Sequence, residues 1–243
     1  MFHDARLKVE RAERHISDIQ SIVSTLPESD VSGIEVDAKS GGHSITHHIP
    51  HMQEILTDVA LITGDAVHNL RASLDYAWLT ILEALNLPVS KFSKFPFVKT
   101  AKELEAALVE KKIDTASPAL FHCMISKIKP YPGGNDLLCA LHELDILDKH
   151  KLLLTVVSYG GVTGIRVEDE HGAEHRGDTW GTFSPGLVYV DFQPQIKIKD
   201  HGKLTIEVIF GEQSPLQGSE VWYELKMLSA TVLHCLSIME KLI

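Results

Sequence analysis

Polar side chains recur at helical spacing within the segment GDAVHNLRASLDYAW, which covers residues 64–78. An α-helix turns about 100° per residue, so His68, Arg71 and Asp75 share one stripe beside the apolar stripe of the same helix. Gly64 lies in line with them and leaves space for another backbone or a ligand. A guanidinium and an imidazole in this arrangement can stabilise negative charge and move protons near neutral pH. The simpler alternative is structural, with Arg71 bridging Asp75 across one helical turn.

A second segment, NDLLCALHELDILDKHK, carries an acid where its apolar pattern would place a leucine. The apolar face of this predicted helix is marked by Leu137, Leu141 and Leu144. The next position on that face is Asp148, and a buried carboxylate without a partner is costly or has its pKa raised. Arg71 offers a planar fork that suits a carboxylate, so we predict an Arg71–Asp148 pair between the two helices.

These observations predict one polar cluster between two helices. Its predicted members are His68, Arg71, Asp75, His142, Glu143, Asp148 and His150. In a catalytic cluster, Arg71 would stabilise developing negative charge while His68 or His150 moves protons. In a structural cluster, Arg71 would only tie the two helices together.

The segment GGHSITHHIPH offers a different chemistry, metal binding. Its histidines are His43, His47, His48 and His51. On a strand, His43 and His47 point to the same side and could begin a metal site, completed by His68 or by the region of Glu143 and Asp148. No HExxH motif or clustered Cys/His spacing accompanies them. An exposed histidine-rich hairpin is therefore the favoured interpretation, and any metal or cofactor stays unassigned.

Two long helices are predicted to position these side chains. Apolar residues recur every three or four positions over residues 4–26 and 51–86, and a hairpin is predicted between them over residues 33–49. Antiparallel packing of the two helices would bury both apolar stripes. Shorter helices are predicted over residues 100–112, 117–128 and 135–149. Their starts carry capping signals at Thr100 and Glu103, at Ser117 and Pro118, and at Asn135 or Asp136.

The pattern then changes to β-branched runs, which predict about four antiparallel strands over roughly residues 152–212. LLLTVVSY and VTGIRVEDE are interpreted as two strands joined by a hairpin at SYGGVTG, and EHRGD as a turn. A last helix, capped by Ser219, is expected to return to the bundle. The prediction is an α+β fold in a single domain, residues 1–243, with a helical part at 1–150 and 217–243 and a β-rich insertion at 151–216.

The composition narrows the class of protein. A formal net charge of −10 over 243 residues argues against broad electrostatic binding to nucleic acid. No apolar run is long enough to span a membrane, and the charged start MFHDARLKVERAERH does not resemble a signal peptide. The three cysteines are odd in number and far apart, so we expect no disulfide framework and a cytoplasmic location.

Together, GDAVHNLRASLDYAW, FPF, KPY and LHELDILDKHKLLL resemble a widespread family of bacterial proteins with no established activity. In that family the long helix reads close to GDALHNLRSALDH and the later helix close to LHELDNIDKHR. The family's Arg and His, five residues apart, in turn resemble the HEPN domain. HEPN domains are helical bundles, often dimeric, and many are metal-independent ribonucleases with an Arg-x4–6-His motif. Arg71 matches the arginine, whereas Tyr76 stands at the histidine position and removes the usual acid–base group.

Three function classes follow from these patterns. The leading hypothesis is a hydrolase with a polar Arg/His/carboxylate pocket between two helices, most concretely a HEPN-like, metal-independent, RNA-directed hydrolase. The first alternative is a non-catalytic interaction or regulatory module of the same fold. The second is a metal-dependent hydrolase that uses clustered His and Asp/Glu side chains. We also expect a homodimer through the helices, since Tyr76 and Trp78 extend the aromatic character beyond one helix face.

Overall fold

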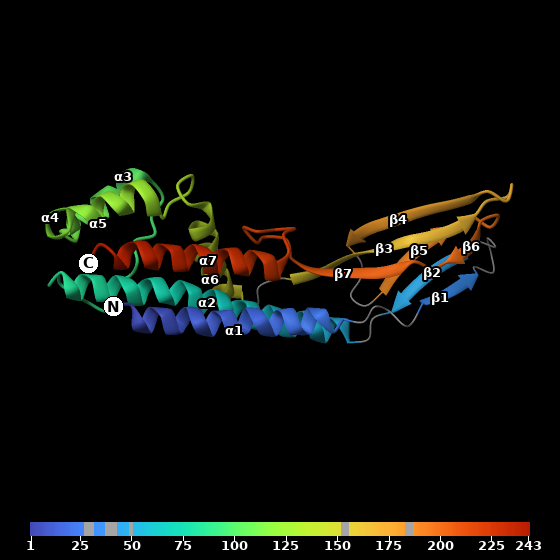
Figure 1. Cartoon of the computed structure of the whole chain (residues 1–243), viewed down its shortest axis with the longest axis horizontal. Coiled ribbons are helices and arrows are strands. Elements are labelled where there is room, and N and C mark those ends of the chain that lie inside the picture. The colour runs from blue at the N-terminus through green and yellow to red at the C-terminus, as the bar shows by residue number, and fades with distance from the viewer. Residues whose placement is uncertain (27–31, 37–42, 49–50, 152–155, 183–186) are drawn as a thin grey trace.

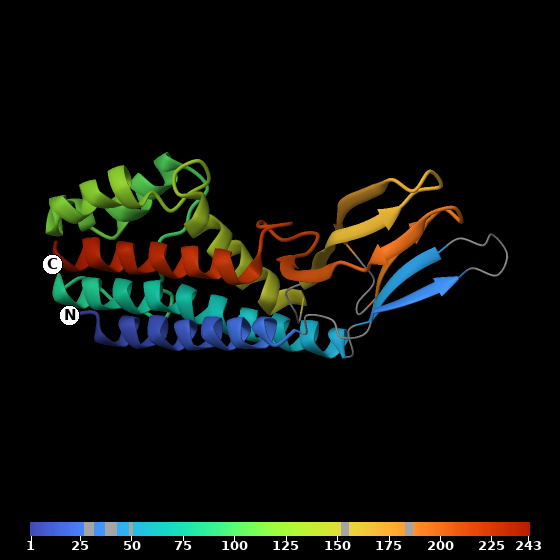
Figure 2. The same ribbon diagram turned by 45° about the vertical axis from the view of Figure 1, so that its right-hand side comes forward.

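Two long helices form the base of the molecule. The computed structural model describes residues 1–26, 32–36, 43–48, 51–151, 156–182 and 187–243. Helices α1 (His3–Ser24) and α2 (Met52–Ala84) lie side by side and run in opposite directions, as the apolar stripes predict (Figures 1 and 2). Their apolar stripes are buried along most of their length.

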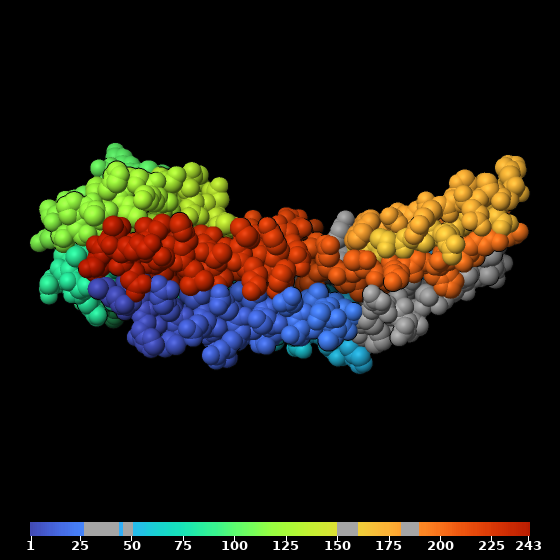
Figure 3. All heavy atoms as spheres, in the orientation of Figure 1, coloured from blue at the N-terminus to red at the C-terminus, as the bar shows by residue number. Residues whose placement is uncertain are grey.

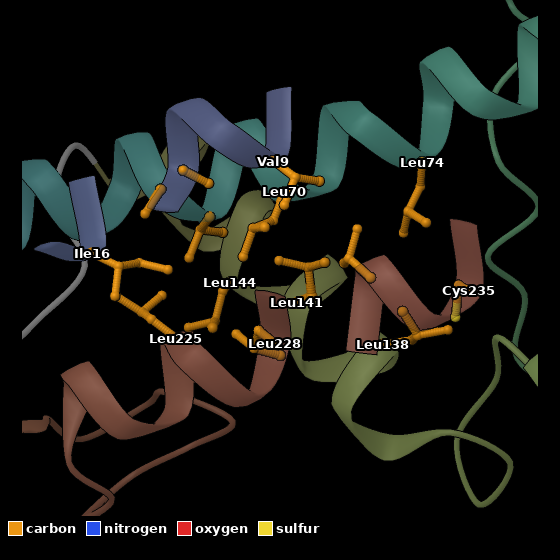
Figure 4. Close-up of a cluster of buried hydrophobic side chains, with 14 of the residues drawn as sticks. Val9, Ile16, Leu70, Leu74, Leu138, Leu141, Leu144, Leu225, Leu228 and Cys235 are labelled. Atoms are coloured by element: carbon orange, nitrogen blue, oxygen red, sulfur yellow. The ribbon is translucent and has the colours of Figure 1, made fainter. Parts of the chain in front are cut away.

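The helical body is completed by α6 (Asp136–Lys151) and α7 (Val221–Glu240), which pack on α2. Leucines from both helices meet α1 and α2 in a shared core, shown in Figure 4 by Val9, Ile16, Leu70, Leu74, Leu138, Leu141, Leu144, Leu225 and Leu228. The predicted return of the last helix to the bundle is thereby confirmed. On α6 the predicted face residues Leu141 and Leu144 are buried, but the first member of the buried face is Leu138, and the predicted Leu137 is only partly buried.

Short helices cover one side of this body: α3 (Ala101–Glu110), α4 (Ile113–Ala116), α5 (Pro118–Cys123) and a π-helical turn η1 (Met124–Ile128). The predicted caps form, because Thr100 accepts the Glu103 amide at 3.2 Å and Asn135 accepts the Leu138 amide at 3.2 Å. The prediction that Ser219 caps the last helix is wrong. Helix α7 begins after Glu220, whose side chain makes no capping hydrogen bond.

The strands form an arm that extends from one end of the helical body (Figures 1 and 3). One sheet has the order β1 (Ser32–Val36), β2 (His43–His48), β5 (Leu187–Phe192). In the other, β3 (Val156–Glu168) pairs with β4 (Glu174–Thr182) on one side and with β6 (Lys197–Asp200) and β7 (Lys203–Phe210) on the other. All the pairings are antiparallel, so the α+β fold class is confirmed.

Two details of the sheet prediction are wrong. The expected hairpin at SYGGVTG is the interior of the single strand β3, and EHRGD belongs to β4. Close approach of the neighbouring strands explains the glycines, since a Cβ on Gly160 would lie 2.6 Å from the carbonyl oxygen of Thr205. The two strands of the hairpin predicted over 33–49 do pair, while its turn lies outside the described residues. Strand β2 also pairs with β5, so the hairpin strands are part of the larger arm. No helix in the described ranges is long and apolar enough to cross a membrane.

Candidate functional site

Helices α2 and α6 meet along a ladder of polar contacts. We use "α2–α6 ladder" for the rungs Gly64–Asp148, His68–Asp145 and Arg71–His142. The side chain of Asp148 packs against Gly64, His68 Nδ1 lies 3.1 Å from Asp145 Oδ1, and Arg71 Nε donates to His142 Nδ1 at 3.3 Å. Numbering rises along α2 while it falls along α6, as expected for antiparallel helices whose facing residues are three or four apart.

The middle rung is an imidazole held by a buried acid. Asp145 is 5% exposed, whereas the His68 side chain is 52% exposed. The second carboxylate oxygen of Asp145 accepts from Lys149 Nζ at 2.5 Å. Because an ionised carboxylate can only accept, the neutral form of His68 that makes this contact carries its proton on Nδ1 and keeps a lone pair on Nε2. This pair can therefore accept a proton from a bound molecule.

The third rung buries Arg71 among aromatic and polar partners. Arg71 is 6% exposed, and its Nη1 lies 2.7 Å from Asp75 Oδ1 in an ion pair whose angles do not make a hydrogen bond. The guanidinium carbon lies 4.5 Å from the ring centroid of Phe97, which also stacks on His142 at 4.5 Å. Burial, and then the charge of Arg71, lower the pKa of His142. His142 is thus held neutral and accepts the Arg71 hydrogen bond.

The predicted Arg71–Asp148 pair does not form: within the described part of the chain, Arg71 pairs with Asp75 and His142 instead. The reason is the register of the two helices. His142 stands level with Arg71, and Asp148 is six residues, or about 9 Å, further along α6. The structural alternative, a bridge from Arg71 to Asp75, is the contact observed.

The remaining rung places the carboxyl group of Asp148 in the space left by Gly64. A Cβ on Gly64 would lie 2.8 Å from Cγ of Asp148. No hydrogen bond or ion pair of Asp148 occurs in the described residues, and burial raises the pKa of its carboxyl group, with further contributions from Asp145 and Asp65. The sequence predicts that Gly64 lies on the same stripe of α2 as the polar residues and leaves space for another group. Its space is filled by a side chain of the same protein.

Replacing Gly64 with alanine should reveal this contact. In an Asp148→Ala background, we expect Gly64→Ala to raise the free energy of unfolding by about 1 kcal/mol, the difference in helix propensity. In the wild-type background the new Cβ displaces the Asp148 carboxyl group, so the same change should lower that free energy. Urea unfolding of the four proteins gives the coupling energy. Equal effects of Gly64→Ala in both backgrounds would contradict the contact.

Asp148→Asn should stabilise the protein in a pH-dependent way. A carboxyl group whose pKa is higher in the folded state than its ordinary value of 3.8 binds protons more readily when folded. Its ionisation therefore costs stability, fully so above the folded-state pKa and not at all below 3.8. We expect the Asn variant to melt higher than wild type at pH 7, and the difference to shrink as the pH is lowered. A constant difference across that range would count against the raised pKa.

The other predicted site residues lie elsewhere or cannot be placed. Glu143 is exposed and outside the ladder, because it points away from the face that carries Asp145. The side chains of His150, His43, His47 and His48 lie outside the described residues. His51 is exposed and contacts Glu54 at 2.9 Å. The described residues contain no group of three His, Cys, Asp or Glu side chains placed to hold a metal ion.

Sequence reasoning missed Asp145 and Phe97. Asp145 follows Leu138 by seven residues and Leu141 by four, so a face centred on Leu138 would have identified it as the buried acid. Phe97 comes from the segment between α2 and α3, and no spacing rule connects it with Arg71. A buried histidine of α1, His15, also went unnoticed, and burial lowers its pKa.

The two positions that correspond to the Arg-x4-His motif, Arg71 and Tyr76, have different surroundings in the structure. Arg71 is buried, whereas Tyr76 is 44% exposed with its ring centroid 6.0 Å from Lys8 Nζ. The two side chains therefore do not converge on one site. The chain matches no model of a known protein family, no curated protein and no solved structure.

Proposed function

We propose that the chain is a hydrolase in which His68 is the general base. The observation that carries this proposal is the pairing of a buried acid, Asp145, with an exposed imidazole at 3.1 Å. A carboxylate that fixes the tautomer of a histidine and stabilises its protonated form is a recurrent arrangement in hydrolases. Arg71 has no direct catalytic part in this scheme, since its guanidinium is enclosed by Asp75, Phe97 and His142.

Asp148 and Lys149 provide the complementary chemistry. A carboxyl group with a raised pKa can donate a proton, and the ammonium of Lys149, half-exposed beside Asp145, can stabilise developing negative charge. In the RNA-directed form of the proposal, His68 takes the proton of a ribose 2′-hydroxyl, whose oxygen attacks the adjacent phosphorus. Asp148 then protonates the departing 5′-oxygen. The products are a 2′,3′-cyclic phosphate and a free 5′-hydroxyl, without a metal ion.

Cleavage of a mixed RNA pool in the presence of EDTA tests this function. Wild-type protein should generate cyclic-phosphate ends, and His68→Ala should not. His122→Ala is the matched control, because His122 is exposed on α5, away from the ladder, and should have no effect. An RNA pool left intact by the wild-type protein would refute the RNA-directed form.

The burial of Arg71 favours a second candidate, a non-catalytic interaction or regulatory module. Arg71 is the residue that matches the HEPN arginine, and at 6% exposure it cannot reach a substrate phosphate without rearrangement. The net charge of −10 also disfavours RNA. In that case His68 and Asp145 only join two helices, and the protein should capture a partner from an extract without altering RNA.

A metal-dependent hydrolase is the third candidate, and elemental analysis of the purified protein separates it from the other two. Stoichiometric zinc or another transition metal would support it, with the histidines of residues 43–51 as the first ligands to replace. A cytoplasmic location suits all three candidates, since Cys123, Cys139 and Cys235 are all free thiols.

The proposed homodimer would use the exposed surface of α1 and α2. Trp78 is 1% exposed and belongs to the core, so it contributes nothing to an interface, contrary to what its position suggested. The large apolar side chains that remain exposed on the two helices are Leu7, Leu61 and Tyr76. Sedimentation at micromolar concentration should show a dimer, and a single species of 27.0 kDa would contradict it.

A further inference from the structure

A concavity of about 420 Å³ lies in the arm, far along the chain from the α2–α6 ladder. It is formed where β3, β4 and the β6–β7 turn come together. The side chains and backbone that matter for its chemistry belong to Gly164, Arg176, Asp178, Asp200, Gly202 and Lys203. Its volume is within the range of small-molecule sites, and larger than a bare inorganic ion requires.

The concavity is produced by a β-bulge. The register between β3 and β4 shifts between Val162 and Ile165, and the amide of Gly164 donates to Asp178 Oδ1 at 2.7 Å. Gly164 has a φ of +74°, a conformation that L side chains rarely adopt. Bulges bend a strand and re-aim its side chains, and they are frequent beside functional sites.

The β6–β7 turn completes the wall by approaching β3 closely. Gly202 has a φ of +74°, and a Cβ there would lie 2.6 Å from the carbonyl oxygen of Thr163. The amide of Gly202 donates to Asp200 Oδ1 at 3.1 Å, while Asp200 Oδ2 lies 3.0 Å from Arg166 Nη2. Both carboxylates in the concavity are thus already engaged by protein groups that hold the backbone in place.

The two cations of the concavity, Arg176 and Lys203, differ from its carboxylates, because no protein group in the described residues engages their charges. Neither the Arg176 guanidinium nor the Lys203 ammonium makes an ion pair or side-chain hydrogen bond within the described ranges, although both line the concavity. Arg176 also stands directly opposite Arg166 in the β3–β4 register. Like charges across a strand pair repel, so an anion beside Arg176 would relieve an unfavourable contact. The lining holds two cations, Arg176 and Lys203, and two carboxylates, Asp178 and Asp200, and both carboxylates already accept hydrogen bonds from protein groups.

We propose that this concavity binds a small phosphorylated polyol. The phosphate would be held by Arg176 and Lys203, because a guanidinium and an ammonium together suit a compact oxyanion. The free lone pairs of Asp178 and Asp200 would accept hydrogen bonds from hydroxyl groups. This site is independent of the proposed hydrolase function.

Glycerol 3-phosphate, inorganic phosphate and glycerol are suitable probes of the site in the full chain. Binding is followed by ¹H–¹⁵N NMR at the amides of Gly164 and Gly202, which lie in the walls of the concavity. We expect saturable shifts with glycerol 3-phosphate, weaker binding of inorganic phosphate, and no shift with glycerol. Arg176→Ala and Lys203→Ala should each weaken glycerol 3-phosphate binding by about tenfold or more, the effect of losing one charge-assisted hydrogen bond.

Lys197→Ala is the control, because Lys197 lies on β6 but points its ammonium to Glu168 at 3.2 Å. It should bind glycerol 3-phosphate as wild type does. Equal affinity for inorganic phosphate and glycerol 3-phosphate would overturn the polyol assignment. Shifts that do not saturate, or that persist in Arg176→Ala and Lys203→Ala, would overturn the site.

Discussion

Arg71→Ala is expected to lower the free energy of unfolding by about 3–5 kcal/mol, the range for removing one partner of a buried ion pair. The guanidinium is almost fully buried, and three groups depend on it: the carboxylate of Asp75, the ring of Phe97 and the imidazole of His142. Among the described residues, removal leaves Asp75 with only the Phe95 amide, 2.8 Å away, as a donor. It also leaves a cavity beside Phe97. Urea unfolding followed by circular dichroism measures the change.

Two further variants separate the causes of this loss. Arg71→Lys keeps the charge but cannot stack on Phe97 as a planar group, so it should lose an intermediate amount. Arg14→Ala is the control, because Arg14 is exposed on α1, and its effect should stay within about 0.5 kcal/mol. If Arg71→Ala costs less than about 1 kcal/mol, Arg71 is not the buried tie between α2 and α6 that its contacts indicate.

The activity of the Arg71→Ala variant tests the proposed mechanism, just as its stability tests the contacts of Arg71. Arg71 lies one rung from His68 on the α2–α6 ladder and contacts neither His68 nor Asp145 in the described part of the chain. The fraction of Arg71→Ala that folds should therefore keep the activity of wild type. A complete loss of activity in well-folded Arg71→Ala protein would instead mean that Arg71 takes part directly in the reaction, as the HEPN resemblance implies.

The stripe on α2 could be predicted from sequence because it depends only on the regular geometry of one helix. Gly64, His68, Arg71 and Asp75 do face one side, and every one except Asp75 meets α6 directly. The partner on α6 could not be predicted in the same way. Which residue faces Arg71 depends on where the two helices cross along their axes. A shift of one turn replaces Asp148 with Asp145, and a shift of nearly two turns replaces it with His142.

The strands show a similar limit. Alternating β-branched residues identified β5 and β7, where side chains have two distinct faces. Gly160 and Gly161 were interpreted as a turn, because sequence alone does not reveal that another strand passes too close for a side chain. The concavity in the arm was missed for the same reason. Its glycines acquire meaning only when β3, β4 and the β6–β7 turn are brought together.

His68→Ala and Asp145→Asn are expected to lower the rate of RNA cleavage together, as parts of one proton-transfer unit. Loss of a general base costs about 10²–10⁴ in rate, and we expect His68→Ala to fall in that range. In Asp145→Asn the amide can donate to Nδ1, which moves the imidazole proton to Nε2 and removes the lone pair that accepts the substrate proton. The rate should therefore fall by at least about a hundredfold although the imidazole is still present.

The double variant distinguishes this unit from two independent effects. If Asp145 acts only through His68, then His68→Ala/Asp145→Asn should be no slower than His68→Ala alone, because residues that act as a unit are not additive. His68 is half-exposed, so its removal should change the melting temperature little, and the loss of rate cannot then be ascribed to unfolding. Single-turnover cleavage at saturating protein measures all three rates. If the losses of rate in the double variant multiply, Asp145 acts on the reaction independently of His68. A rate for His68→Ala within about threefold of wild type, far above the expected range, would show that His68 is not the general base.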